Sequence, residues 1–214
     1  MCKAERLHRE GILPKRITHC DTKVNNMLFD ENGKEVEKFD GRLTTAGCEK
    51  AADFVKKCDA FNIPVLTLTN VEGYATSVEE ETTIATAAAK LTAAFVEADV
   101  PKVNLIVGKA YGSAYITMNS KHIGADMVFA LPTAQIGMMD ANVAAKIMYA
   151  DDKDVNLSEK ASEFAAQSGT EAAAARGYID SVIEPEAARK QVLYAFEMLF
   201  TKSEYPIGKK HGTI

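Results

Sequence analysis

The chain has 214 residues, of which 47% are apolar and 26% charged, and its formal net charge is −5. This length allows one sizeable core and does not require two domains. Lysine and arginine are spread along the chain instead of forming a basic stripe, and tryptophan is absent, so the composition argues against a nucleic-acid partner.

Cysteine and histidine spacing predicts neither a disulfide framework nor a metal site. The four cysteines show no CxxC spacing, so we expect reduced thiols in a cytoplasmic protein, and the four histidines are scattered. No stretch approaches the roughly 20 apolar residues of a membrane span. The first residues also lack the apolar run of a signal peptide, so we expect no membrane insertion.

Residues 1–40 differ in composition from the rest of the chain and are predicted to form an N-terminal extension. Charge is dense there, and apolar residues are isolated. The turn former Asn32-Gly33 separates two short apolar stretches, 27–29 and 36–39, which predicts a hairpin. A single domain is expected over residues 41–214.

The pattern becomes helical from Gly47, where apolar residues recur at spacings of three and four up to Phe61. Asn62 and Pro64 end this helix, and the β-branched run 64–69 follows as a predicted buried strand. A second helix is predicted over 79–98, because acidic residues at its start suit a helix N-terminus. A second strand is predicted over 103–107.

The remaining elements are predicted to continue the same alternation. We expect a turn over 108–113, a helix over 114–121 and short strands over 126–130 and 135–138. Residues 142–200 read as mostly helical, with a break at Gly177. Strands that alternate with helices pair in parallel, so the expected fold class is α/β. The Ala-rich helix 84–98 and the C-terminal helices carry more apolar surface than a small domain needs to bury, which predicts an oligomer.

Two strand-to-helix turns are candidate binding sites, since ligands of parallel α/β sheets gather at the carboxyl ends of the strands. One turn is 69–74 and the other is 109–115. In the second, Gly112, Ser113 and Ala114 are small enough for a ligand to approach the main chain, and the following helix adds a positive dipole end. These residues could form an oxyanion hole. The simpler interpretation is close packing of the helix on the sheet.

Other chemically suggestive residues have simple structural interpretations. Ser113 lacks the GxSxG context of a nucleophile, and no histidine stands in a recognisable triad setting. His122 fits a helix end, whereas Cys48 and Cys58 fit a helix start and a core position. The acidic run 79–81 fits a helix start.

Ordered sequence blocks between about Gly41 and the C-terminus carry a family resemblance. They are residues 58–67 (CDAFNIPVLT), 100–103 (VPKV), 109–115 (KAYGSAY), Met118, 120–122 (SKH), 130–136 (ALPTAQI), 175–185 (ARGYIDSVIEP) and 209–212 (KKHG). In order and near-identical spacing, these blocks resemble the C-terminal half of the carboxyltransferase subunits of acyl-CoA carboxylases and biotin-dependent decarboxylases.

The resemblance implies a crotonase-like α/β fold, a spiral of ββα units, in a single domain. It also implies a transferase or ligase that handles a carboxyl group carried on biotin and an acyl-CoA substrate. In that family the active site lies between the N-terminal half of one subunit and the C-terminal half of another. The expected partners are therefore an N-terminal-type carboxyltransferase subunit and a biotin carrier protein, in a homo- or hetero-oligomer, with the isolated chain inactive.

The resemblance further implies which residues contact biotin. The backbone N–H groups of Ser113 and Ala114 would hold the biotin ureido oxygen, with Gly112 providing room. Preorganised N–H donors stabilise negative charge on such an oxygen without any ionisable side chain. The other implied contacts are Val71, Glu72, Gly73, Tyr74 and Tyr111.

The chain departs from the family pattern at three places. Glu72 stands where the family usually has proline, Thr86-Ala87-Ala88 replaces a common Arg-His-Gly, and Ser113 replaces the second glycine of a Gly-Gly turn. Two alternatives therefore remain open. The chain could be a non-catalytic structural or regulatory subunit that kept the fold, or a stand-alone crotonase-type hydratase or isomerase that uses a carboxylate such as Glu72.

Overall fold

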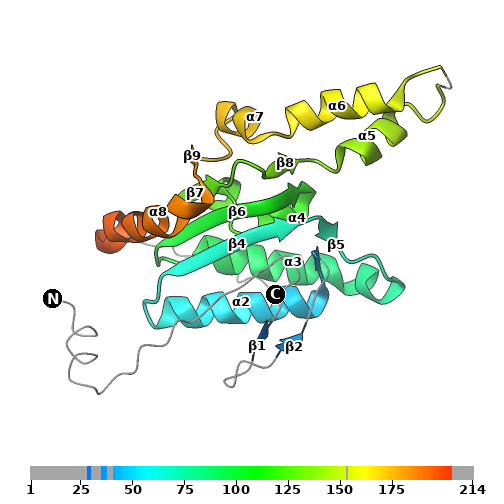
Figure 1. Cartoon of the computed structure of the whole chain (residues 1–214). Coiled ribbons are helices and arrows are strands. Elements are labelled where there is room, and N and C mark those ends of the chain that lie inside the picture. Colours follow the sequence, from blue (N-terminus) through cyan, green and yellow to red (C-terminus); the bar gives the residue numbers. More distant parts are fainter. Residues whose placement is uncertain (1–27, 30–34, 38–40, 153, 204–214) are drawn as a thin grey trace.

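A parallel sheet forms the centre of the molecule in this computed structural model, which describes residues 28–29, 35–37, 41–152 and 154–203. Figure 1 shows helices on both sides of the sheet. Its strands follow the order β4 (Val65–Val71), β6 (Lys102–Tyr111), β7 (Met127–Ala130) and β9 (Ser181–Val182), and β8 (Gln135–Gly137) pairs with the carboxyl end of β6. Every pair in this sheet is parallel, so the predicted α/β class is confirmed.

Helices α2 (Thr45–Ala60) and α3 (Val78–Glu97) cover one face of the sheet (Figure 1). The hydroxyl of Thr44 caps α2 and that of Ser77 caps α3, each accepting a backbone N–H three residues later. The predicted apolar stripe of α2 is confirmed up to Cys58. Phe61, however, is 75% exposed, because α2 ends at Ala60 and the last member of the stripe leaves the helix axis.

The apolar side predicted for α3 is buried within this chain. Leu91 and Phe95 lie in the main core, and Ala88 is also buried. Val96 on the same helix is 56% exposed, so α3 keeps some apolar surface. The C-terminal helix α8 (Pro185–Met198) also keeps such surface, since Leu193 and Met198 remain exposed while the opposite side of the helix packs on the second face of the sheet.

Both predicted turns are shorter than expected, because strand pairing extends into them. Residues 109–111 pair with β8, so β6 continues through most of the predicted turn 108–113. Likewise β4 runs to Val71, and β5 (Gly73–Tyr74) pairs in parallel with β3 (Arg42–Leu43). The helix predicted over 114–121 is α4 (Gly112–Thr117), followed by the 3-10 turn η1 (Lys121–Ile123).

The C-terminal part is mostly helical, as predicted, and breaks at Gly177, which has φ +75°. The short strand β9 within it was not predicted. At the other end of the chain, β1 (Leu28–Phe29) and β2 (Glu35–Glu37) pair antiparallel, which confirms the predicted pairing, although its Asn32-Gly33 turn lies outside the described residues. The remaining helices are α5 (Ala141–Met148), α6 (Leu157–Gln167), α7 (Thr170–Ala175) and the 3-10 turn η2 (Leu199–Thr201).

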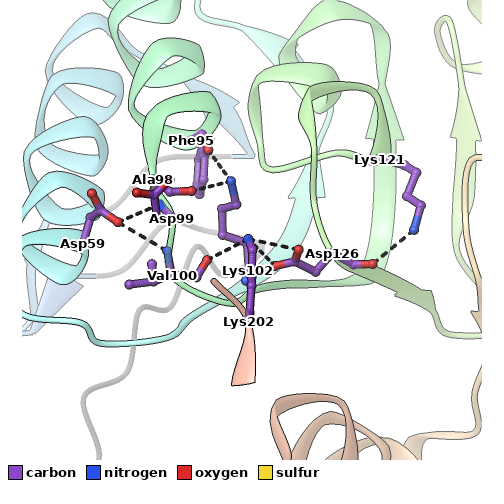
Figure 2. A network of polar contacts seen from close by, with 9 residues as sticks. All are labelled: Asp59, Phe95, Ala98, Asp99, Val100, Lys102, Lys121, Asp126 and Lys202. Atoms are coloured by element: carbon purple, nitrogen blue, oxygen red, sulfur yellow. Dashed lines mark hydrogen bonds and ion pairs between the residues drawn. The ribbon is translucent and has the colours of Figure 1, made fainter. Parts of the chain in front are cut away.

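A polar network fixes the amino ends of β6 and β7 (Figure 2). The buried Lys102 ammonium donates to the carbonyls of Phe95 at 2.7 Å and Ala98 at 2.8 Å. Its charge compensates the partial negative charge at the C-terminal end of α3. The Asp126 carboxylate accepts the backbone N–H of Lys102 at 2.7 Å and the ammonium of Lys202 at 3.0 Å. This network fastens the segment after α8 to the sheet, at the opposite end of the strands from the predicted site.

Candidate functional site

The two segments predicted to form the site lie side by side at the carboxyl ends of β4 and β6 (Figure 1). Val71 stands opposite Ala110 in the parallel register. The Tyr74 hydroxyl lies 2.9 Å from the hydroxyl of Thr117, which links β5 to α4. The structure thus brings residues 71–74 and 109–114 together at one end of the sheet.

An irregularity in the pairing of β4 with β6 shapes this end of the sheet. Thr69 is opposite Ile106 and Val71 is opposite Ala110, so β6 carries extra residues between these two pairs. The side-chain oxygen of Asn70 fills the gap and accepts the backbone N–H of Lys109 at 2.7 Å. This contact supplies the partner that the regular ladder does not give to that N–H.

Gly112 starts α4 in a conformation that favours glycine. Its φ is +61°, and a Cβ at this position would lie 3.2 Å from the carbonyl oxygen of Met138. Ser113 is exposed and Ala114 is buried in the main core. The first N–H groups of a helix have no intrahelical acceptor, and no side chain caps α4.

An ion pair flanks this turn. The Lys109 ammonium donates to the Glu72 carboxylate at 2.6 Å, and the two side chains are 43% and 42% exposed. The hydrogen bond to Glu72 raises the pKa of Lys109, and partial desolvation opposes that rise. Lys109 is therefore a cation over the whole neutral range of pH.

A buried tyrosine stands two residues further along β6. The Tyr111 hydroxyl donates to the side-chain oxygen of Gln135 on β8. Burial raises the pKa of Tyr111, the negative charge of Asp140 raises it further, and the Lys109 cation acts in the opposite direction. Tyr111 is consequently a neutral hydrogen-bonding group that links β8 to β6.

The predicted contact residues differ in what they can offer a ligand. Glu72 is exposed and Gly73 and Tyr74 are half-buried, whereas Val71 lies in the core and presents only its backbone. Sequence reasoning placed Asn70 and Lys109 within the two candidate turns but assigned neither of them a role in the site. Asn70 follows the predicted β-branched strand directly, and its partner Lys109 is 39 residues away.

The other chemically suggestive residues are structural. Cys48 and Cys58 are buried, and burial raises the pKa of the Cys48 thiol to about 12 and that of Cys58 above its usual value. The Glu80 carboxylate of the acidic run accepts the N–H and hydroxyl of Thr45, both at 2.6 Å, and so joins the starts of α3 and α2. His122 packs against the ring of Tyr178, with centroids 4.9 Å apart.

Two further features of the described ranges bear on function. No group of three or more histidine, cysteine or acidic side chains within residues 41–152 and 154–203 is arranged to hold a metal ion. Across the same part of the chain, every helix is too short or too polar to cross a membrane.

Comparison with known proteins identifies the family. Residues 25–214 match the carboxyl transferase domain. The chain belongs to this family. It is 45% identical over 186 residues to the propionyl-CoA carboxylase beta chain of Saccharopolyspora erythraea, a match that covers 81% of this chain and 34% of that protein. It is 40% identical over 211 residues to the methylmalonyl-CoA decarboxylase subunit alpha of Propionigenium modestum, covering 94% of this chain and 40% of the relative.

Solved carboxyltransferase structures share the fold. The transcarboxylase 12S structure, described as a hexamer assembly with methylmalonyl-coenzyme A bound, matches with a TM-score of 0.77 and 39% identity over 81% of this chain and 34% of its own. The beta subunit of P. aeruginosa geranyl-CoA carboxylase, at 23% identity and a TM-score of 0.69, supports the fold alone. The predicted crotonase-like fold is confirmed. The carboxyl transferase domain described here spans only about a third to two fifths of the length of these relatives.

Proposed function

We propose that this chain is the biotin-facing half of a split biotin-dependent carboxyltransferase. It would transfer a carboxyl group between biotin on a carrier protein and an acyl-CoA, together with a separate N-terminal-type subunit that binds CoA. Membership of the carboxyl transferase family supports the reaction class. The names of the relatives, a propionyl-CoA carboxylase and a methylmalonyl-CoA decarboxylase, support an acyl-CoA substrate.

The observation that carries the biotin-facing role is the turn from β6 into α4. Gly112 has no side chain and a positive φ, so a planar ring can approach the main chain closely. The N–H groups of Ser113 and Ala114 follow in a helix start that no side chain caps. These features fit the ureido oxygen of biotin, an acceptor without a proton.

When bound, biotin would supply the carboxyl group, and negative charge would develop on its ureido oxygen as that group leaves. The backbone donors of Ser113 and Ala114 are held in place before that charge forms, because α4 is packed in the core through Ala114. Loss of one preorganised donor of this kind typically costs roughly 3 to 4 kcal/mol of transition-state stabilisation.

The surroundings of Glu72 support this role over the hydratase alternative. A hydratase carboxylate must be directed at substrate, whereas the Glu72 carboxylate binds the Lys109 ammonium. The pairing also limits the repulsion that a lone carboxylate would exert on an anion at the turn. Assembly into a homo- or hetero-oligomer is part of the proposal, and the hexamer described for transcarboxylase 12S supports it.

Purification of the tagged chain from its native host tests the proposal. A CoA-binding carboxyltransferase subunit and a biotinylated carrier should co-purify, and the complex should exchange a carboxyl group between an acyl-CoA and biotin. The isolated chain should not catalyse this exchange. Turnover of an acyl-CoA with free biotin by the isolated chain would contradict the proposal, and an intact but inactive complex would favour the non-catalytic subunit.

A further inference from the structure

Lys109 lies near the end of β6, the strand that leads into the proposed biotin site. Side chains alternate along a strand, so Lys109 and Tyr111 lie on the same face of β6, and the core residue Ala110 lies on the other. The strand leads directly into Gly112. Lys109 therefore lies three residues before Gly112, on the strand that leads into the proposed donor turn.

The backbones of both ion-pair partners are fixed, while their side chains reach solvent. Asn70 accepts the N–H of Lys109, and the carbonyl of Gly41 accepts the N–H of Glu72 at 2.8 Å. The exposed fractions of the two side chains, 43% and 42%, leave the charged ends accessible. An ammonium has three donors, and Glu72 takes one of them. The remaining donors can bind another acceptor.

We propose that the Lys109 ammonium binds the carboxylate of a ligand that occupies the site at the Ser113 and Ala114 N–H groups. Glu72 weakens this binding because its carboxylate competes for the same ammonium. The inference rests on the proposed function and names a specificity residue for that same site. Glu72 would then set the affinity of Lys109 for an anionic ligand. This role differs from stabilising the folded chain.

Two substitutions that break the same ion pair separate this role from a structural one. Lys109→Met removes the cation, whereas Glu72→Gln removes only the competing charge and keeps the backbone N–H that binds Gly41. If Lys109 binds a carboxylate, the first variant weakens binding and the second tightens it. A purely structural ion pair predicts that both variants shift binding in the same direction, since each loses the same contact.

Calorimetric titration of the complex isolated from its native host measures this directly. The probe is a biotin amide with a carboxymethyl group on the ureido nitrogen, and its methyl ester is the uncharged control. We expect Lys109→Met to raise the Kd of the acid roughly five- to tenfold and Glu72→Gln to lower it about two- to fourfold, with the ester unaffected. Lys90→Met is the matched control, because Lys90 pairs with Glu49 at 3.0 Å between α3 and α2 with similar exposure. It should change neither Kd.

A carboxylate can reach this place on biotin or on the acyl chain of a dicarboxylic acyl-CoA. Titration with methylmalonyl-CoA and propionyl-CoA distinguishes the sources, since Lys109→Met weakens only the ligand whose carboxylate it contacts. Equal affinity of wild-type protein for acid and ester, together with no effect of Lys109→Met on methylmalonyl-CoA, would overturn the inference and leave the proposed function intact. Failure of the wild-type complex to bind either biotin probe would overturn both.

Discussion

The side-chain oxygen of Asn70 accepts the backbone N–H of Lys109 at 2.7 Å, and this contact depends on Gly108. A Cβ on Gly108 would lie 2.5 Å from the same oxygen. The close approach therefore requires both an amide on β4 and the absence of a side chain on β6. The pair sets the path of β6 into the turn at Gly112.

Asn70 and Gly108 should be energetically coupled. Asn70→Ala leaves the Lys109 N–H without its acceptor and should lower the free energy of unfolding by about 1 to 2 kcal/mol. Gly108→Ala creates a clash and should cost about 1 to 3 kcal/mol. In the double variant the clash disappears with the amide, so urea unfolding should show a total cost below the sum of the two. Strictly additive costs would show that the two residues do not share this contact.

The Lys202 ammonium should stabilise the attachment of the segment after α8. Lys202→Met leaves the Asp126 carboxylate, whose side chain is only 14% exposed, with less compensation for its charge. We expect the free energy of unfolding to fall by about 2 kcal/mol. Lys160→Met, which breaks the surface pair with Glu163 on α6, is the control and should have no measurable effect. Equal urea midpoints for the Lys202 variant and wild type would contradict the role of the network in Figure 2.

The buried thiol of Cys48 should make stability fall at alkaline pH. Its pKa is raised from 9.0 to about 12, chiefly by burial and then by the charges of Glu80 and Glu49. The buried, protonated thiol contributes fully to the free energy of unfolding below pH 9, where the thiol of the unfolded chain is also protonated. This contribution is lost as the pH rises from 9 towards 12, because the thiol of the unfolded chain then ionises first.

The measurement compares wild type with Cys48→Ala, so that other titrating groups cancel. The stability advantage of wild type over the variant should shrink by about 2 kcal/mol between about pH 8 and pH 10.5. A difference that stays constant with pH would mean that the thiol ionises as readily in the folded chain as in the unfolded one.

The arrangement of helices and parallel strands could be predicted from the sequence because it follows from local patterns. The apolar stripe of α2 and the β-branched run of β4 show their periods within a few residues. The length of β6 could not be predicted, since Gly108 and the small residues 112–114 indicate a turn locally. Pairing of residues 109–111 with β8 extends the strand, and that pairing depends on residues some 25 positions later.

The candidate site was predictable only in part for the same reason. The turn at Gly112 has a local signal in its small residues, whereas Lys109 contacts Glu72 and Asn70, which are 37 and 39 residues away in the sequence. Phe61 shows the converse error. Its spacing continues the stripe of α2, but the helix ends one residue earlier and the ring is exposed.

The rates of two folded variants in the reconstituted complex test the backbone role of Ser113 and Ala114 most directly. Ser113→Ala keeps the N–H and the small size, so most of the carboxyltransferase activity should remain. Ala114→Pro removes a donor from the first turn of α4, where no intrahelical bond is lost, and should nearly abolish kcat. Ala114→Ser, which keeps the donor, is the control for crowding, and circular dichroism checks that all variants fold. Loss of activity in Ser113→Ala with retention in Ala114→Pro would contradict the account, because it would make the Ser113 hydroxyl, and not the backbone, the group that acts.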